Sequence, residues 1–150
     1  MPKTLILGVG NLLMADDGVG IRVIERIEAT RTLPEDVQTL DGGTCGLDLL
    51  HFLEGVEELI VVDAADFGLP AGTIQRLEGD AVPAFLAKKI SPHEINLPEL
   101  LFSAKLVGIY PLRVVVLGIQ PQTIEVGLEL SPAVAAQVDV LADRVLSEIS

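Results

Sequence analysis

The chain has few aromatic residues, one cysteine and few basic residues, and each shortage excludes a class of protein. Aromatic residues make up 3% of the 150 residues and tryptophan is absent, so the core must be built from aliphatic side chains. The single cysteine, Cys45, excludes an internal disulfide framework and suits a reducing compartment. With 10 basic against 22 acidic residues, the formal net charge is -12, which opposes binding to nucleic acid and to anionic membranes.

Long apolar runs are also missing. No stretch of about 18 apolar residues, the length that crosses a membrane, occurs in the sequence. The apolar run after Lys3 is too short for the core of a signal peptide, so we expect a cytoplasmic protein without a membrane partner. Hydrophobic residues make up 49% of the chain, and no linker or internal repeat interrupts it. We therefore expect one domain over residues 1–150.

Apolar runs of strand length alternate with helical patterns along the chain, which is typical of parallel strands joined by right-handed crossovers. The expected strands are 4–9, 37–40, 59–62, 73–77 and 112–119, of which 73–77 is an edge strand. The first expected helix begins near Asp17, and three more are expected at about 47–53, 81–89 and 97–106. A closing amphipathic helix is expected to start at Ser131-Pro132, with the Ser131 hydroxyl as its cap and Pro132 at its first position. The predicted fold class is α/β, a three-layer αβα fold with a mainly parallel, twisted sheet of about five strands and helices on both faces.

The end of the first expected strand resembles a phosphate-binding turn but carries the wrong charge. Gly8-Val9-Gly10 begins like a dinucleotide fingerprint, in which glycines allow pyrophosphate to approach a helix N-terminus. Leu13 then stands where the third glycine is expected. The acidic pair Asp16-Asp17 would bring negative charge close to any phosphate group. A pocket at this place should prefer a cation.

Three acidic residues follow three expected parallel strands. Asp17 comes after the first strand, Asp41 ends the second and Asp63 ends the third. The carboxyl ends of parallel strands share one edge of a sheet, where open α/β folds bind their ligands, so we expect these acids to converge. His93 is the natural fourth member of the group. An imidazole with carboxylates suits Ni²⁺, Zn²⁺, Mn²⁺ or Fe²⁺ better than Ca²⁺.

Each of these residues also has a purely structural explanation. Asp16 and Asp17 fit a helix cap and a first helical turn, where an acid suits the helix dipole. Asp41 fits the turn that the following glycine pair predicts. Asp63 and His93 need only hydrogen-bond partners in the fold. Their joint occurrence is what favours a metal site over these separate explanations.

Four blocks of the sequence resemble, in the same order and at similar spacing, the hydrogenase maturation endopeptidases. The blocks are Gly8–Gly20, Asp41–Thr44, Val61–Ala64 and Lys89–His93. The resemblance implies an aspartyl-type endopeptidase that removes a short C-terminal extension from the precursor of a nickel-iron hydrogenase large subunit. Cleavage would follow nickel insertion, so the implied partner is that precursor and the implied cofactor is nickel, supplied by the substrate.

The resemblance also assigns roles to individual residues. The metal-binding and catalytic residues would be Asp17, Asp63 and His93. The substrate cleft would include Asp41, Gly42 and Gly43. Two other functions fit the same residues: a nickel-binding chaperone would use the acids and His93 without cutting its partner, and a nucleotide-binding module would use the glycine turn.

Overall fold

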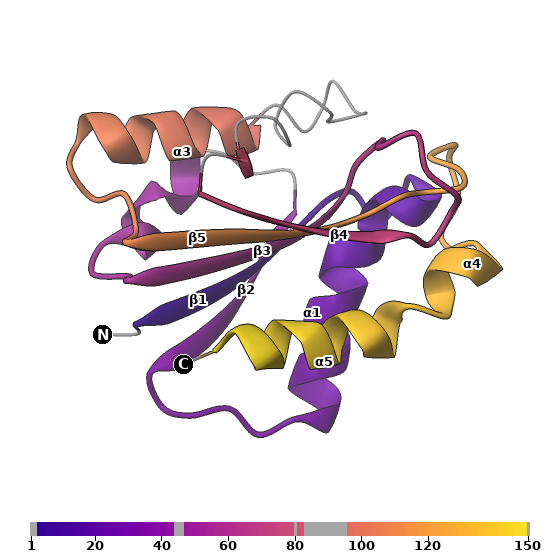
Figure 1. Ribbon diagram of the computed structural model, residues 1–150, viewed down its shortest axis with the longest axis horizontal. Helices are drawn as coiled ribbons and strands as arrows, with labels where there is room; N and C mark the ends of the chain where they lie inside the picture. The colour runs from indigo at the N-terminus through magenta and orange to yellow at the C-terminus, as the bar shows by residue number, and fades with distance from the viewer. Residues whose placement is uncertain (1–2, 44–46, 80, 83–95, 150) are drawn as a thin grey trace.

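The computed structural model describes residues 3–43, 47–79, 81–82 and 96–149 (Figure 1). Its centre is a five-stranded sheet in the order β2-β1-β3-β5-β4. The strands are β1 (Thr4–Val9), β2 (Val37–Gly43), β3 (Glu58–Ala64), β4 (Ile74–Glu78) and β5 (Arg113–Ile119). The strands β2, β1, β3 and β5 run parallel, and β4 pairs antiparallel with β5 at one edge. This arrangement confirms the predicted sheet and its edge strand.

Helices cover both faces of the sheet (Figure 1). On one face lie α1 (Val19–Thr30) and α5 (Val138–Glu148), which pack against each other. On the other face lie α3 (Asn96–Leu106) and the 3-10 helix η2 (Leu47–Leu53). Two short helices precede the long helices of the first face: η1 (Ala15–Gly18) precedes α1, and α4 (Pro132–Ala135) precedes α5. The three-layer α/β prediction is therefore confirmed.

The core is aliphatic on both sides of the sheet. Ile6 and Ile60 point toward α1 and α5, whereas their neighbours Leu7 and Val61 point toward η2 and α3. Because successive residues of a strand face opposite sides, a strand that is covered on both sides must be apolar throughout. The uninterrupted run in β3 meets this requirement. The scarcity of aromatic residues is therefore no obstacle to a complete core.

The backbone of α1 approaches the sheet so closely that two positions accept only glycine. A Cβ on Gly20 would lie 2.2 Å from the carbonyl oxygen of Val62 and 2.6 Å from that of Val9. A Cβ on Gly8 would lie 2.4 Å from the carbonyl oxygen of Gly20. All three separations are far below ordinary van der Waals contact. The two glycines therefore hold the beginning of α1 directly against β1 and β3.

Three expected elements differ from the structure. The strand expected at 37–40 continues to Gly43, and the register with β1 shifts between Gly8 and Val9. The helix expected from Ser131 is divided into α4 and α5, although Val134, Leu141 and Val145 share one core, which preserves the apolar stripe. The segment 47–53 is a 3-10 helix. Most of the helix expected at 81–89 lies outside the described residues.

Among the described residues, none of the helices has both the length and the apolar character that a membrane crossing requires.

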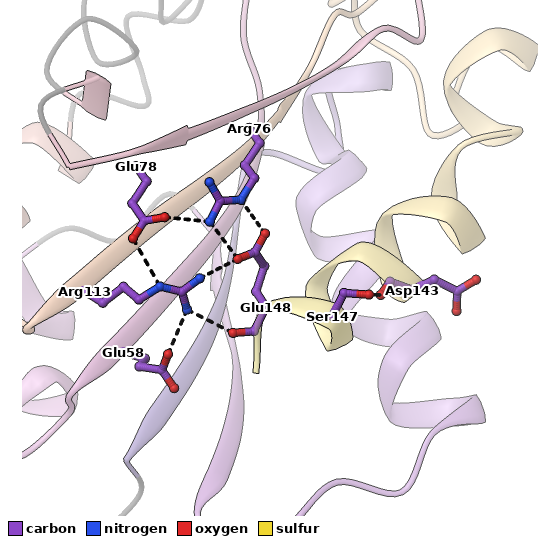
Figure 2. Close-up of polar contacts among 7 residues, drawn as sticks. All are labelled: Glu58, Arg76, Glu78, Arg113, Asp143, Ser147 and Glu148. Atoms are coloured by element: carbon purple, nitrogen blue, oxygen red, sulfur yellow. Dashed lines mark hydrogen bonds and ion pairs between the residues drawn. The ribbon is translucent and has the colours of Figure 1, made fainter. Parts of the chain in front are cut away.

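Five charged residues join the amino ends of β3 and β5, and the neighbouring part of the antiparallel strand β4, to the end of α5 (Figure 2). Arg113 donates hydrogen bonds to Glu58 Oε2 at 2.7 Å and to Glu148 Oε1 at 2.6 Å. Arg76 donates to the same Glu148 oxygen at 2.9 Å and to Glu78 Oε1 at 2.6 Å. Glu148 thus accepts from two arginines on different strands. The network ties the last turn of α5 to β3, β4 and β5.

This network predicts a pH-dependent contribution of Glu148 to stability. The hydrogen bond from Arg76 is the main cause that holds the pKa of Glu148 below its usual value. A carboxyl with a lowered folded-state pKa stabilises the fold above its unfolded pKa and loses this effect as the pH falls through the folded value. We expect Glu148→Gln to lower the free energy of unfolding by about 2 kcal/mol at pH 7.

Urea unfolding of both proteins at several pH values measures this effect. The difference between wild type and Glu148→Gln should shrink as the pH falls below about 5, through the ordinary pKa of glutamate and then through the lowered folded-state pKa of Glu148. A difference that stays constant across this range would show that the charge of Glu148 contributes nothing.

Candidate acidic site

The carboxyl ends of β1, β2, β3 and β5 lie along one edge of the sheet, because these four strands run parallel. Two of the predicted acids are fully buried there. Asp17 lies in η1, directly after the turn that follows β1, and Asp63 is the penultimate residue of β3. Since η1 packs against β3, the elements that carry these two carboxylates are in direct contact.

The loop before η1 holds Asp17 in place. The Oδ2 atom of Asp17 accepts a hydrogen bond from the backbone N–H of Asn11 at 3.1 Å. The side chain of Asn11 in turn accepts from the N–H of Leu13 at 2.9 Å. Gly10 adopts a φ of 142°, which L side chains rarely reach, so the turn requires glycine. The glycines of the opening motif therefore shape a loop whose backbone binds a carboxylate, in place of the phosphate that such loops often hold.

Asp63 directly follows the apolar run Leu59–Val62 of β3, the central strand of the sheet. It follows Leu59 and Val61 on the face that η2 and α3 cover, and its register partner on β5 is Gly118. Its Oδ1 atom accepts a hydrogen bond from the N–H of Ala64 at 2.8 Å. Two buried carboxylates that lie close together repel each other unless a bound cation, a shared proton or hydrogen-bond donors offset their negative charges. Two such groups on touching elements are therefore suited to receive a cation.

Asp41 reaches the same edge of the sheet but lies apart from these two acids. It is exposed on the edge strand β2, pairs with Gly8, and shares a strand face with Thr39, which bonds to Glu28 of α1. Asp41 and Asp63 therefore occupy opposite faces of the sheet, with β1 between their strands. The prediction that Asp17, Asp41 and Asp63 converge was therefore wrong for Asp41, which the strand register places on the other face of the sheet.

The turn expected at Gly42 and Gly43 is a continuation of β2. Gly8 pairs with Asp41 and Val9 pairs with Gly43, so Gly42 is the extra residue of a bulge. A Cβ on Gly42 would lie 2.8 Å from Leu7 Cδ1, so a larger residue there would displace the end of that buried leucine side chain. The prediction of a turn was wrong because the bulge keeps the strand paired beyond the first glycine. The role of Asp41, Gly42 and Gly43 in a substrate cleft stays a prediction.

His93 and Cys45 lie outside the described residues. Within the described ranges, no three histidine, cysteine, aspartate or glutamate side chains gather into a metal site. The assignment of His93 as a ligand therefore stays a prediction.

Asp16 has a role that the sequence did not reveal. Its carboxylate is fully buried and accepts four hydrogen bonds from a segment more than 100 residues away. The donors are the N–H groups of Gln122, Thr123 and Ser131, at 2.8, 3.1 and 2.7 Å, and the hydroxyl of Ser131, at 2.8 Å. Asp16 thereby fastens the chain that follows β5 to η1.

These contacts correct two predictions about helix caps. Ser131 occupies the N-cap position of α4, but its side chain makes no capping bond and donates to Asp16 Oδ2 instead. Neither η1 nor α1 has a side-chain cap, so the capping role expected for Asp16 was also wrong. The physical reason is the same in both cases: a buried carboxylate competes for the hydroxyl and for three backbone donors at once.

A hollow of about 220 Å³ opens beside this segment, between the loops that follow β3 and β5. It is lined by Asp66 and residues 120–124. The nearly buried side chain of Gln120 joins the two loops, because its Oε1 atom accepts from the N–H of Phe67 at 2.6 Å and its Nε2 atom donates to Asp66 at 3.2 Å. The hydrogen bonds of Gln120 therefore hold together the two loops that line the hollow.

Comparison with known proteins identifies the family. The family model described as hydrogenase maturation protease matches residues 21–148. The chain is also 46% identical over 149 residues to the hydrogenase expression/formation protein HupD of Rhodobacter capsulatus, which covers 98% of this chain and 71% of that protein. The chain belongs to the hydrogenase maturation protease family. It is therefore an endopeptidase of hydrogenase processing, as the resemblance of the sequence implied.

Solved structures of maturation proteases share the fold. The hydrogenase maturating endopeptidase HybD from Escherichia coli superposes with a TM-score of 0.91 at 35% identity, over 98% of this chain and 91% of that one. The hydrogenase maturation protease HybD from Thermococcus kodakarensis superposes with a TM-score of 0.81 at 26% identity, over 98% of each chain. The likeness in fold extends over nearly the whole chain.

The four hydrogen bonds of Asp16 predict that its charge stabilises the maturation protease fold. Asparagine at this position presents an amide NH₂ group toward donors and removes the negative charge that they surround. We expect Asp16→Asn to lower the free energy of unfolding by about 3 kcal/mol, as measured by urea denaturation.

Asp139→Asn is the matched control, because Asp139 is exposed and makes one surface ion pair with Arg26 at 2.7 Å. Loss of this ion pair should lower the free energy of unfolding by less than about 1 kcal/mol. Equal effects of the two substitutions would refute the structural role of Asp16.

Proposed function

We propose that this protease removes the C-terminal extension from the large-subunit precursor of a nickel-iron hydrogenase after nickel insertion, and that it recognises the inserted nickel through Asp17, Asp63 and His93. The observation that carries the proposal is the burial of Asp17 and Asp63 on elements that contact each other. Carboxylates and an imidazole form a donor set that suits Ni²⁺. The resemblance of the sequence to its family adds His93 to the set.

Nickel belongs to the substrate in this proposal, so it reports whether the precursor is complete. Binding of this nickel by the two acids would position the adjoining polypeptide, and orientation of a reactive bond is itself a large contribution to catalysis. The aspartyl-type character of the enzyme would follow if one carboxylate then accepts a proton from the attacking water. The hollow lined by Asp66 and residues 120–124 is a suitable place for the polypeptide beyond the scissile bond. The single cysteine supports the cytoplasm as the compartment.

The test compares two forms of one substrate. Purified protein is incubated with nickel-loaded and with nickel-free precursor, and the mass of the large subunit is measured over time. We expect the nickel-loaded precursor to lose its extension and the nickel-free precursor to stay intact. Equal cleavage of both forms would remove the role of nickel, whereas cleavage of neither would contradict the proposed activity.

Substitution of the acids tests their part in this reaction. Asp17→Asn and Asp63→Asn should each reduce the cleavage rate of nickel-loaded precursor by roughly 100-fold or more, because each removes a charged ligand or proton acceptor. The exposed Asp139→Asn variant should cleave at the wild-type rate. Circular dichroism of each variant verifies that the fold is retained. Wild-type rates for the two buried-acid variants would refute their assignment.

A further inference from the structure

Three apolar side chains project into solvent beside the acidic site. Leu13, Val126 and Leu128 are 60%, 86% and 66% exposed. They come from two segments that lie side by side: the N–H of Gly127 donates to the carbonyl oxygen of Leu13 at 2.9 Å, and Met14 and Gly127 form a parallel β-bridge. We call these three residues the apolar shelf.

The backbone beneath the apolar shelf is held firmly. The N–H of Ala15 donates to the carbonyl oxygen of Gly127 at 2.8 Å, and Arg22 of α1 donates to the carbonyl oxygen of Leu128 at 3.1 Å. The carboxylate of Asp16 fastens the same segment at Gln122 and Thr123. A surface that is fixed before binding loses little conformational entropy when a partner covers it. The shelf therefore has the rigidity of a binding surface.

The apolar shelf is continuous with the loop that holds Asp17. The N–H of Asn11 binds the carboxylate of Asp17, and two residues later Leu13 contributes the first side chain of the shelf. The N–H of Asp17 also donates to the carbonyl oxygen of Met14 at 3.1 Å. The shelf therefore borders the loop that holds Asp17. Any polypeptide that an endopeptidase cuts at Asp17 and Asp63 must continue past them.

We propose that the apolar shelf binds an apolar segment of the precursor polypeptide next to its scissile bond, and that basic residues flank this segment. The inference rests on the proposed function. Burial of exposed apolar surface is what drives such association. The charge of the flanking residues follows from Glu125 and Glu129, which are both exposed and border Val126 and Leu128, and from the net charge of -12.

Kinetics of the intact protease with nickel-loaded precursor test the apolar shelf. The double variant Val126→Ser/Leu128→Ser should raise KM about tenfold while kcat changes less than twofold, because the contacts are made equally in the bound substrate and in the transition state. Leu112→Ser is the matched control, since Leu112 is 87% exposed but precedes β5 at the opposite end of the sheet. The control should keep the wild-type KM, and thermal unfolding should be the same for all three proteins.

The charged border has its own measurement. The wild-type KM should rise with ionic strength, and Glu125→Gln/Glu129→Gln should weaken this dependence. If both double variants keep the wild-type KM while the wild type cleaves the precursor, the shelf proposal is wrong and the proposed function stands. Dissociation of a dimer by the Val126→Ser/Leu128→Ser change, with an unaltered KM, would assign the shelf to a second copy of the chain and overturn the proposal. Absence of cleavage by the wild type would instead contradict the function itself.

Discussion

The contact between the α1 backbone and the sheet at Gly20 is the constraint on which the acidic site depends. Gly20 leaves no room for a side chain between α1 and the carbonyl oxygens of Val9 and Val62. Val9 is the last residue of β1, and Val62 directly precedes Asp63 in β3. The contact therefore lies at the carboxyl edge of the sheet. It holds the start of α1 against β3, and Asp17 lies only three residues before Gly20. A larger residue at this position would move one half of the site away from the other.

The neighbouring carboxylates of Asp16 and Asp17 bind different segments of the chain at this edge. Asp16 turns toward the chain that follows β5 and is surrounded by four donors from Gln122, Thr123 and Ser131. Asp17 turns toward the loop before it and accepts from Asn11. Asp16 holds in place the segment that carries Val126 and Leu128. Asp17 belongs to the proposed nickel site. One dipeptide thus contributes to both the proposed substrate surface and the proposed nickel site of this hydrogenase maturation protease.

The sequence predicted features that depend on local patterns and failed where distant segments meet. The uninterrupted apolar run Leu59–Val62 predicted the buried parallel strand β3. The position of Asp63 directly after this run predicted a carboxylate at the carboxyl edge of the sheet. Ser131 was interpreted as a helix cap because its neighbour Pro132 is a local signal, whereas its partner Asp16 lies 115 residues away. The glycines after Asp41 predicted a turn because the bulge that keeps β2 paired depends on the register with β1. A single sequence contains no local signal for either contact.

The central claim is that Asp17 and Asp63 together bind the nickel of the substrate. X-ray absorption at the nickel edge measures this most directly, in a complex of wild-type protease with nickel-loaded precursor frozen before cleavage. The account predicts new oxygen ligands at about 2 Å that the precursor alone lacks, and their loss when both acids are replaced by asparagine. A nickel environment that is identical with and without the protease would contradict it.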